Sequence, residues 1–99
     1  MDLYQAEWCP HSHKVRQRLT ELGLDFTARQ VPADSDDRAA MVEATGTNEI
    51  PVLVTDEGDI LKGEDEILPW LARFDERDDA ERHREKARKE VKEFSELAA

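Results

Sequence analysis

The stretch Trp8-Cys9-Pro10-His11-Ser12 joins a short strand-like run, residues 2–6, to a helical pattern over residues 10–22. Cys9 is the single cysteine of the chain. A thiol at such a junction lies at the N-terminus of the helix, where unpaired N–H groups and the helix dipole favour the thiolate. The stretch therefore predicts redox or thiol-transfer chemistry at Cys9.

The residues after Cys9 support a helix. Pro10 suits the first helical position, because its missing N–H costs nothing there and its fixed φ matches the helix. An apolar stripe at i, i+4 and i+7 follows, formed by Val15, Leu19 and Leu22. Gly23 then stands where a glycine commonly ends a helix. These signals predict a helix over residues 10–22.

Beyond this helix, strands and helices continue to alternate. Residues 26–31 are typical of a second strand. The acidic cluster at residues 34–37 is expected to cap a helix over residues 39–44, which ends near Gly46. The order up to this point is strand, helix, strand, helix.

The second half begins with two short strands. The apolar residues 51–55 and the turn-type residues 56–59 lead into residues 60–61, which predicts an antiparallel pair. A helix then starts at Glu64, and Pro69 either kinks it or lies in its first turn. One face of this helix is apolar and comprises Ile67, Leu68, Leu71 and Phe74. The complete order, βαβαββα, predicts an α/β fold of three layers around a mixed four-stranded sheet.

The length of 99 residues is that of one domain. We divide the chain into a folded unit, residues 1–74, and a charged helical extension, residues 75–99, in which Glu85 has basic neighbours three and four residues later. The extension is either a terminal helix docked by Phe94 and Leu97 or a dimerisation seam. Its few large apolar residues favour the first interpretation, and hence a monomer.

The charge of the chain excludes several partners. The 24 acidic and 14 basic residues give a formal net charge of −10, which repels nucleic acid and anionic lipid. No apolar run approaches the ~20 residues that span a bilayer, and no apolar segment follows Met1, so we expect a cytoplasmic protein without membrane contact. The acidic composition also suggests a halophilic source, a hypothesis that fails if the protein is equally stable in dilute buffer and in molar salt.

Three motifs carry a resemblance to a known family. The stretch Cys9-Pro10-His11-Ser12, the later Glu49-Ile50-Pro51 and the triplet Gly63-Glu64-Asp65 make residues 2 to about 74 resemble a glutaredoxin, and equally the thioredoxin-fold N-terminal domain of glutathione transferases. The resemblance implies a thioredoxin-like, glutaredoxin-type fold. In such a fold a helix N-terminus presents Cys9, and Pro51 faces it in the cis form.

The resemblance also implies a mechanism. Ser12 stands where the family motif Cys-Pro-Tyr-Cys has its second cysteine, so Cys9 would exchange disulfides by a monothiol route, with Pro10 and Ser12 supporting it. The Ser12 hydroxyl can hydrogen-bond the thiolate and help keep the pKa of Cys9 low. No resident cofactor is implied; glutathione or another low-molecular-weight thiol is the co-substrate, and proteins that carry disulfides are the partners.

The ligand site follows from the same resemblance. Glutathione would lie along the segment before Pro51, with its γ-glutamyl carboxylate at the N–H groups that open the last helix and its ammonium near Asp65. The implied substrate-binding residues are Trp8, His11, Ile50, Pro51, Gly63, Glu64 and Asp65. Residues 47–51 contain no cation for a second carboxylate, and Glu64 and Asp65 also suit the helix dipole.

Charges near Cys9 bear on the pKa of its thiol. Glu7 would raise that pKa if its side chain points inward. Lys14 and Arg16 are candidate compensating charges, although solvated helix residues are the expected state of both. His11 either assists Cys9 as an exposed cation or is a solvated loop histidine.

Other interpretations of the sequence stay open. We expect no metal site, because His11 and His13 diverge from Cys9 on a helix. An iron–sulfur carrier would need a Cys-Gly-Phe-Ser type motif, which the Pro10-His11 pair replaces. A thioredoxin-fold interaction domain with an incidental thiol is the third possibility. Trp8 is a candidate hydrophobic shelf beside the thiol, whereas Trp70 is expected to be packing.

Overall fold

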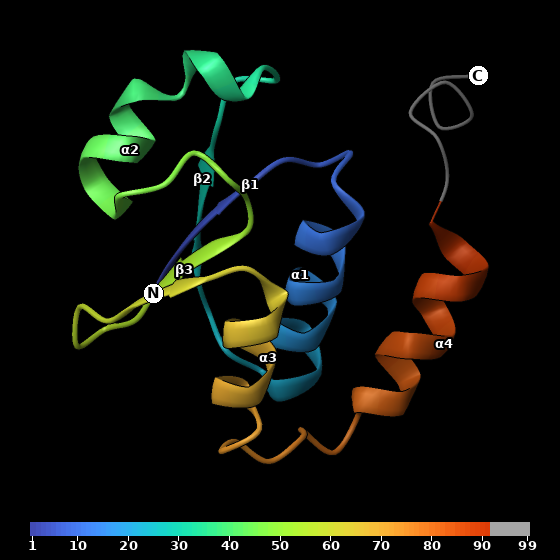
Figure 1. Cartoon of the computed structure of the whole chain (residues 1–99). Coiled ribbons are helices and arrows are strands. Elements are labelled where there is room, and N and C mark those ends of the chain that lie inside the picture. The colour runs from blue at the N-terminus through green and yellow to red at the C-terminus, as the bar shows by residue number, and fades with distance from the viewer. Residues whose placement is uncertain (92–99) are drawn as a thin grey trace, which may run out of the picture.

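The computed structural model describes residues 1–91, and its elements follow the predicted order (Figure 1). These elements are β1 (Asp2–Gln5), α1 (Pro10–Leu22), β2 (Thr27–Gln30), a short 3₁₀ helix (Ser35–Asp37), α2 (Ala39–Thr45), β3 (Val52–Val54), β4 (Ile60–Lys62), α3 (Glu64–Leu71) and α4 (Ala80–Glu90). The bounds of α1 are those that the sequence predicted. Gly23 ends the helix with φ of 67°, a left-handed conformation in which glycine has no steric cost.

The four strands form one mixed sheet in the order β2-β1-β3-β4. Strand β1 pairs in parallel with β2 and antiparallel with β3, and β3 pairs antiparallel with β4. The connection between the parallel strands runs through α1, and β3 and β4 form the expected hairpin. The predicted α/β architecture with a mixed four-stranded sheet is therefore confirmed.

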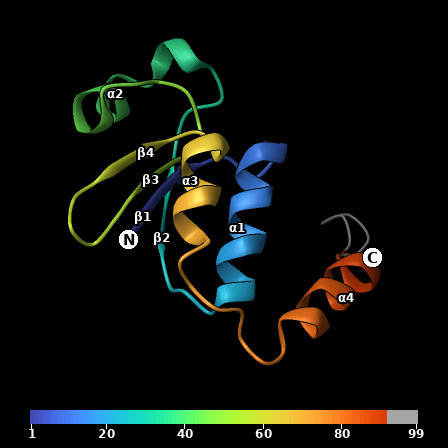
Figure 2. The same cartoon turned by 60° about the horizontal axis from the view of Figure 1, so that its bottom comes forward.

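The core lies where α1 and α3 pack against the sheet. The two helices stand side by side, whereas α2 lies apart from them in both views (Figures 1 and 2). The buried core cluster consists of Leu3, Val15, Leu19, Leu22, Leu53, Ile67 and Leu71. The stripe predicted for α1, formed by Val15, Leu19 and Leu22, is thus the face that α1 buries in the core.

Two local expectations differ from the structure. The acidic residues 34–37 do not cap α2: they belong to the separate 3₁₀ turn, and the N-cap of α2 is Arg38 without a side-chain cap bond. The reason is tertiary, because the buried guanidinium of Arg38 donates to the carbonyl oxygens of Pro32, Ala33 and Asn48 and ties the loop together before α2 begins.

Pro69 lies in the last turn of α3 and not in its first. It has no N–H to donate to the carbonyl of Asp65, and α3 ends two residues later at Leu71. Trp70 is partly buried, and its ring meets Phe74 edge to face at a centroid distance of 5.4 Å, so its expected packing role is confirmed.

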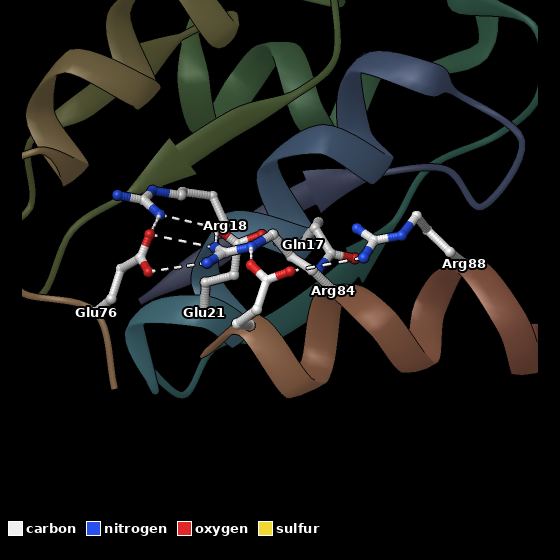
Figure 3. A network of polar contacts seen from close by, with 7 residues as sticks. Gln17, Arg18, Glu21, Glu76, Arg84 and Arg88 are labelled. Atoms are coloured by element: carbon white, nitrogen blue, oxygen red, sulfur yellow. Dashed lines mark hydrogen bonds and ion pairs between the residues drawn. The ribbon is translucent and has the colours of Figure 1, made fainter. Parts of the chain in front are cut away.

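The charged extension contains α4, which packs along α1. Figure 3 shows the polar network between them, in which Glu21 of α1 lies 2.8 Å from Arg18 and 3.0 Å from Arg84 of α4. Arg18 and Arg84 also meet Glu76, at 2.8 and 3.2 Å. The helix is therefore docked by charges around one buried apolar residue, Ala80. The expected docking by Phe94 and Leu97 lies outside the described residues.

The predicted pairing within the extension is found where Lys89 contacts Glu85 at 2.9 Å. Between residues 1 and 91, no helix has both the length and the apolar character that crossing a membrane requires.

Candidate functional site

Cys9 is the N-cap residue of α1. Its backbone is extended, with φ of −79° and ψ of 118°, and its Sγ accepts a hydrogen bond from the backbone N–H of Ser12 at an N···S distance of 3.4 Å. Pro10 occupies the first helical position, where no N–H donor is needed. The Cys9 residue is only 5% exposed, so the sulfur lies just beneath the surface at the positive end of the helix.

The surroundings of Cys9 lower the pKa of its thiol below the ordinary value. Burial alone raises this pKa, but hydrogen bonds from the Ser12 hydroxyl and from the N–H groups of Ser12 and His11, with the charge of Arg16, outweigh it. The Ser12 hydroxyl makes the largest of these lowering contributions, and the two backbone N–H groups at the start of α1 add to it. The helix N-terminus therefore does favour the thiolate.

Ser12 is fully buried in the first turn of α1. Its Oγ accepts a hydrogen bond from the backbone N–H of Ala6 at 3.4 Å. The backbone N–H of Cys9 in turn donates to the carbonyl of Ala6 at 3.2 Å. Ser12 thus closes the loop between β1 and α1 on the inside and stands next to the sulfur.

The charges nearest the thiol differ from the sequence expectation. The side chain of Glu7 is 90% exposed, so it points outward and cannot oppose the thiolate as an inward carboxylate would. Arg16, expected to be solvated, has an 18% exposed side chain that donates to the carbonyl of Ala6 and pairs with Glu7 at 3.1 Å. Arg16 reaches back from α1 to the end of β1, and its charge contributes to the low pKa of Cys9.

The segments that contain Pro51 and Gly63, the second and third motifs of the sequence, are in contact. The Ile50–Pro51 peptide bond is cis, as expected, and Pro51 is fully buried. The carbonyl of Pro51 accepts a hydrogen bond from the backbone N–H of Gly63 at 2.8 Å. Gly63 is the N-cap of α3 with φ of 78°, which glycine adopts without steric cost. The loop before β3 and the start of α3 are therefore held together.

The start of α3 also contacts the first turn of α1. Oε1 of Glu64 lies 2.7 Å from Nδ1 of His11, and Oε2 lies 3.2 Å from Nζ of Lys14. The hydrogen bonds from His11 and then Lys14 lower the pKa of the Glu64 carboxyl. Glu64 thus joins the two helices that carry the candidate motifs, whereas Asp65 is exposed.

Comparison with known proteins assigns the family. The sequence model of the glutaredoxin family matches residues 2–60. The chain belongs to the glutaredoxin family. No curated protein matches the sequence significantly.

Solved structures resemble this glutaredoxin in fold. A glutathione S-transferase from Rhodospirillum rubrum F11 is 27% identical with a TM-score of 0.63, over 73% of this chain and 32% of that one. BphK, a bacterial GST solved as a ternary complex, is 28% identical with a TM-score of 0.63, over 74% and 38%. A glutathione S-transferase domain-containing protein from Marinobacter aquaeolei VT8, at 23% identity and a TM-score of 0.63, shares the fold over 76% and 39%.

The glutaredoxin chain therefore spans roughly a third of the length of these structures. Its fold is the thioredoxin-like one of glutaredoxins and of the N-terminal domain of glutathione transferases, as the sequence indicated.

The structure brings most of the predicted site residues of this glutaredoxin to the same side. Cys9, Pro10, His11 and Ser12 form the first turn of α1, Glu64 contacts His11, and Gly63 is bonded to Pro51. Trp8 is 64% exposed beside the thiol, without the packing that Trp70 has. Ile50 is half-buried.

The sequence did not reveal the side-chain partners of Glu64 and of Arg16. The pair of Glu64 and His11 joins positions 53 apart, and no spacing rule links them. Arg16 could have been predicted as a charge close to the thiol, because a basic residue two turns into a helix can reach back to the loop before it. Within residues 1–91, no group of three or more His, Cys, Asp and Glu side chains is arranged to hold a metal ion.

Proposed function

We propose that this glutaredoxin is a monothiol thiol–disulfide oxidoreductase with Cys9 as its nucleophile. The observation that carries the proposal is the position of Sγ at the N-terminus of α1, where the Ser12 hydroxyl and the N–H groups of Ser12 and His11 lower the pKa of the thiol. A larger thiolate fraction near neutral pH increases the rate of attack on a disulfide.

The reaction has two steps. The Cys9 thiolate attacks the small-thiol sulfur of a mixed disulfide, the new S–S bond forms as the old one breaks, and the substrate thiolate leaves and takes a proton from water. A second small thiolate then attacks the small-thiol sulfur bound to Cys9, which releases a symmetrical disulfide and restores the Cys9 thiolate. The substrate thiol is released in its reduced form, one small thiol is consumed, and the two small-thiol units leave joined by a disulfide.

Ser12 is why the proposed route is monothiol. It stands one helical turn after Cys9, where a second cysteine would close an intramolecular disulfide, and its hydroxyl cannot do so. A second molecule of a low-molecular-weight thiol must therefore resolve the mixed disulfide. Glutathione is the thiol that the names of the similar structures suggest.

The residues around Cys9 supply the proposed substrate site. The buried cis Pro51 and the N-cap Gly63, which are bonded to each other, would accept the backbone of the small thiol as an added strand. Trp8, His11, Ile50, Glu64 and Asp65 complete the proposed contact set. A resident metal or cofactor has no part in these two steps.

The test combines reactivity with two variants. The pH dependence of alkylation by iodoacetamide gives the pKa of Cys9 directly, because the thiolate is the reactive form. Reduction of a mixed disulfide is then measured for the wild type, Cys9→Ser and Ser12→Ala. We expect Cys9→Ser to be inactive and Ser12→Ala to keep much of the activity. Equal loss in both variants would refute the monothiol assignment, and a thiol as weakly acidic as free cysteine would favour a binding module.

A further inference from the structure

The outer side of α1 is the floor of an open groove. Leu68 of α3 forms one wall, and Ala87 and Arg88 of α4 belong to the other. The cavity on the α3 side and the cavity on the α4 side both include Gln17 and Glu21 of the floor, so they are continuous. The α3 side alone has a volume of about 550 Å³, which is in the range of cavities that hold apolar ligands. The groove is therefore large enough to take side chains from another segment.

The charged side chains that line this groove are mostly basic, although the chain as a whole carries a formal net charge of −10. They are the cations Lys14, Arg18, Arg84 and Arg88 and the carboxylate Glu21, and Figure 3 shows all of them except Lys14. Each cation also contacts a carboxylate outside the groove, so charge alone does not hold an occupant here. Their methylene stems add apolar surface to that of Leu68 and Ala87. The groove thus favours an occupant with apolar side chains against its floor and carboxylates at its edge.

The end of α4 lies beside this groove. Arg84 contacts Glu21 near the end of α1, and from there α4 runs back along α1 toward its first turn (Figure 1). The described chain stops at Val91, three residues after Arg88 of the groove wall. The segment that follows Val91 therefore starts next to the groove.

Residues 92–99 have the composition that this groove favours. They contain two large apolar residues, Phe94 and Leu97, and a glutamate directly precedes each of them. Leu97 is six residues after Val91, so an extended chain allows it to lie up to about 20 Å away. The groove floor, residues 10–21 of α1, is about 17 Å long at the rise of an α-helix. The segment is therefore long enough to follow the groove.

We propose that residues 92–99 dock in this groove of their own molecule, with Phe94 and Leu97 against the floor and the two glutamates at the basic edge. The tether favours this occupant over a free partner, because a short link gives the segment an effective concentration in the millimolar range. Within the described residues α4 buries one residue, Ala80, and the docked segment would add apolar contacts to this packing. It would also lie beside Pro10, the residue after Cys9. The inference does not depend on the proposed function.

The test uses a paramagnetic label at the end of the segment. Cys9→Ser combined with Ala99→Cys gives a full-length chain with one attachment point for a nitroxide, which broadens the amide signals of nuclei near it. Docking predicts broadening at Lys14 on the floor and at Leu68 on the α3 wall, and none at Glu43 on α2. The same sample after reduction of the nitroxide by ascorbate is the reference.

Three further variants identify the contacts. Phe94→Ser should reduce the ratio of docked to undocked molecules about tenfold and lower the melting temperature by about 4–8 °C, because a buried aromatic side chain is lost. Val91→Ser is the matched control: it also replaces an apolar residue by serine, but Val91 is 76% exposed, so both measurements should stay unchanged. Ala87→Glu places a carboxylate in the wall and should reduce the broadening at Leu68 as Phe94→Ser does.

Each outcome decides the proposal. Broadening at Lys14 and Leu68 that Phe94→Ser removes and Val91→Ser retains supports docking. Broadening confined to α4, or equal broadening in Phe94→Ser, overturns it. A mixture of nitroxide-labelled chains with isotope-enriched chains without the nitroxide tests a second occupant. If the groove signals broaden in the mixture as strongly as within one chain, a second copy fills the groove, and docking within the molecule is overturned.

Discussion

Replacing Ser12 by alanine tests how the buried hydroxyl supports both stability and thiol acidity. Ser12 is fully buried, and its Oγ accepts the N–H of Ala6, which is itself buried. Without that oxygen a buried N–H loses its partner, which costs about 1–3 kcal/mol. The N···O distance of 3.4 Å is long, so the low end applies, and the better helix propensity of alanine returns a few tenths of a kcal/mol. We therefore expect a net loss of about 1 kcal/mol.

In a domain of this size, that loss lowers the melting temperature by about 4–8 °C. The same substitution removes a hydrogen bond to the sulfur, so the pKa of Cys9 should rise. Thermal unfolding monitored by circular dichroism and alkylation as a function of pH measure the two effects on the same samples. Ser35→Ala, at an exposed position, is the control. If Ser12→Ala melts with the wild type and its thiol titrates at the same pH, Ser12 has neither role.

Three further predictions concern the thiol and its supports. The pKa of Cys9 is lower in the folded than in the unfolded chain, so the unfolded chain binds more protons. The stability that the thiolate contributes should be fully present above the unfolded pKa of about 8.5 and should be lost as the pH falls through the folded pKa. Urea unfolding of the wild type and Cys9→Ser at several pH values can check this, because only the wild type should show this pH-dependent part. Glu21→Gln removes the carboxylate between Arg18 and Arg84, so we expect a loss of about 1 kcal/mol and faster amide hydrogen exchange in α4; unchanged exchange there would show that α4 docks without this network. Gly23→Ala forces a side chain into the left-handed region and should cost about 1 kcal/mol in urea unfolding, whereas Gly23→Asn should cost less; equal losses would mean that φ is not the cause.

The parts of the fold that depend on residues close together in the sequence could be predicted. The start of α1 follows from Cys9 and Pro10, and its end from Gly23, because caps act within one turn. The cap of α2 could not be predicted, since Arg38 takes its partners from loops up to 10 residues away. A local preference of aspartate for caps was overridden there by the need of a buried guanidinium for carbonyl oxygens.

In the candidate site, too, local features could be predicted and contacts between distant residues could not. The position of the thiol could be predicted because the strand-to-helix junction is a local feature. The pairs of Arg16 with Glu7 and of Glu64 with His11 could not, because both depend on which way a long side chain turns after the helices have packed. The sequence therefore predicts where the reactive thiol lies, whereas the pairing of the charges near it depends on side-chain packing.

The backbone contribution to the acidity of Cys9 has a consequence for how such a site can diversify. The N–H groups of His11 and Ser12 belong to the main chain, and any residue except proline would supply the one at position 11. The imidazole of His11, by contrast, points to Glu64. At position 11, the N–H group that lowers the pKa of Cys9 and the imidazole that contacts Glu64 are therefore different atoms of one residue. A library of side chains at this position can change the contact with α3 while the main-chain contribution to the acidity of Cys9 is kept.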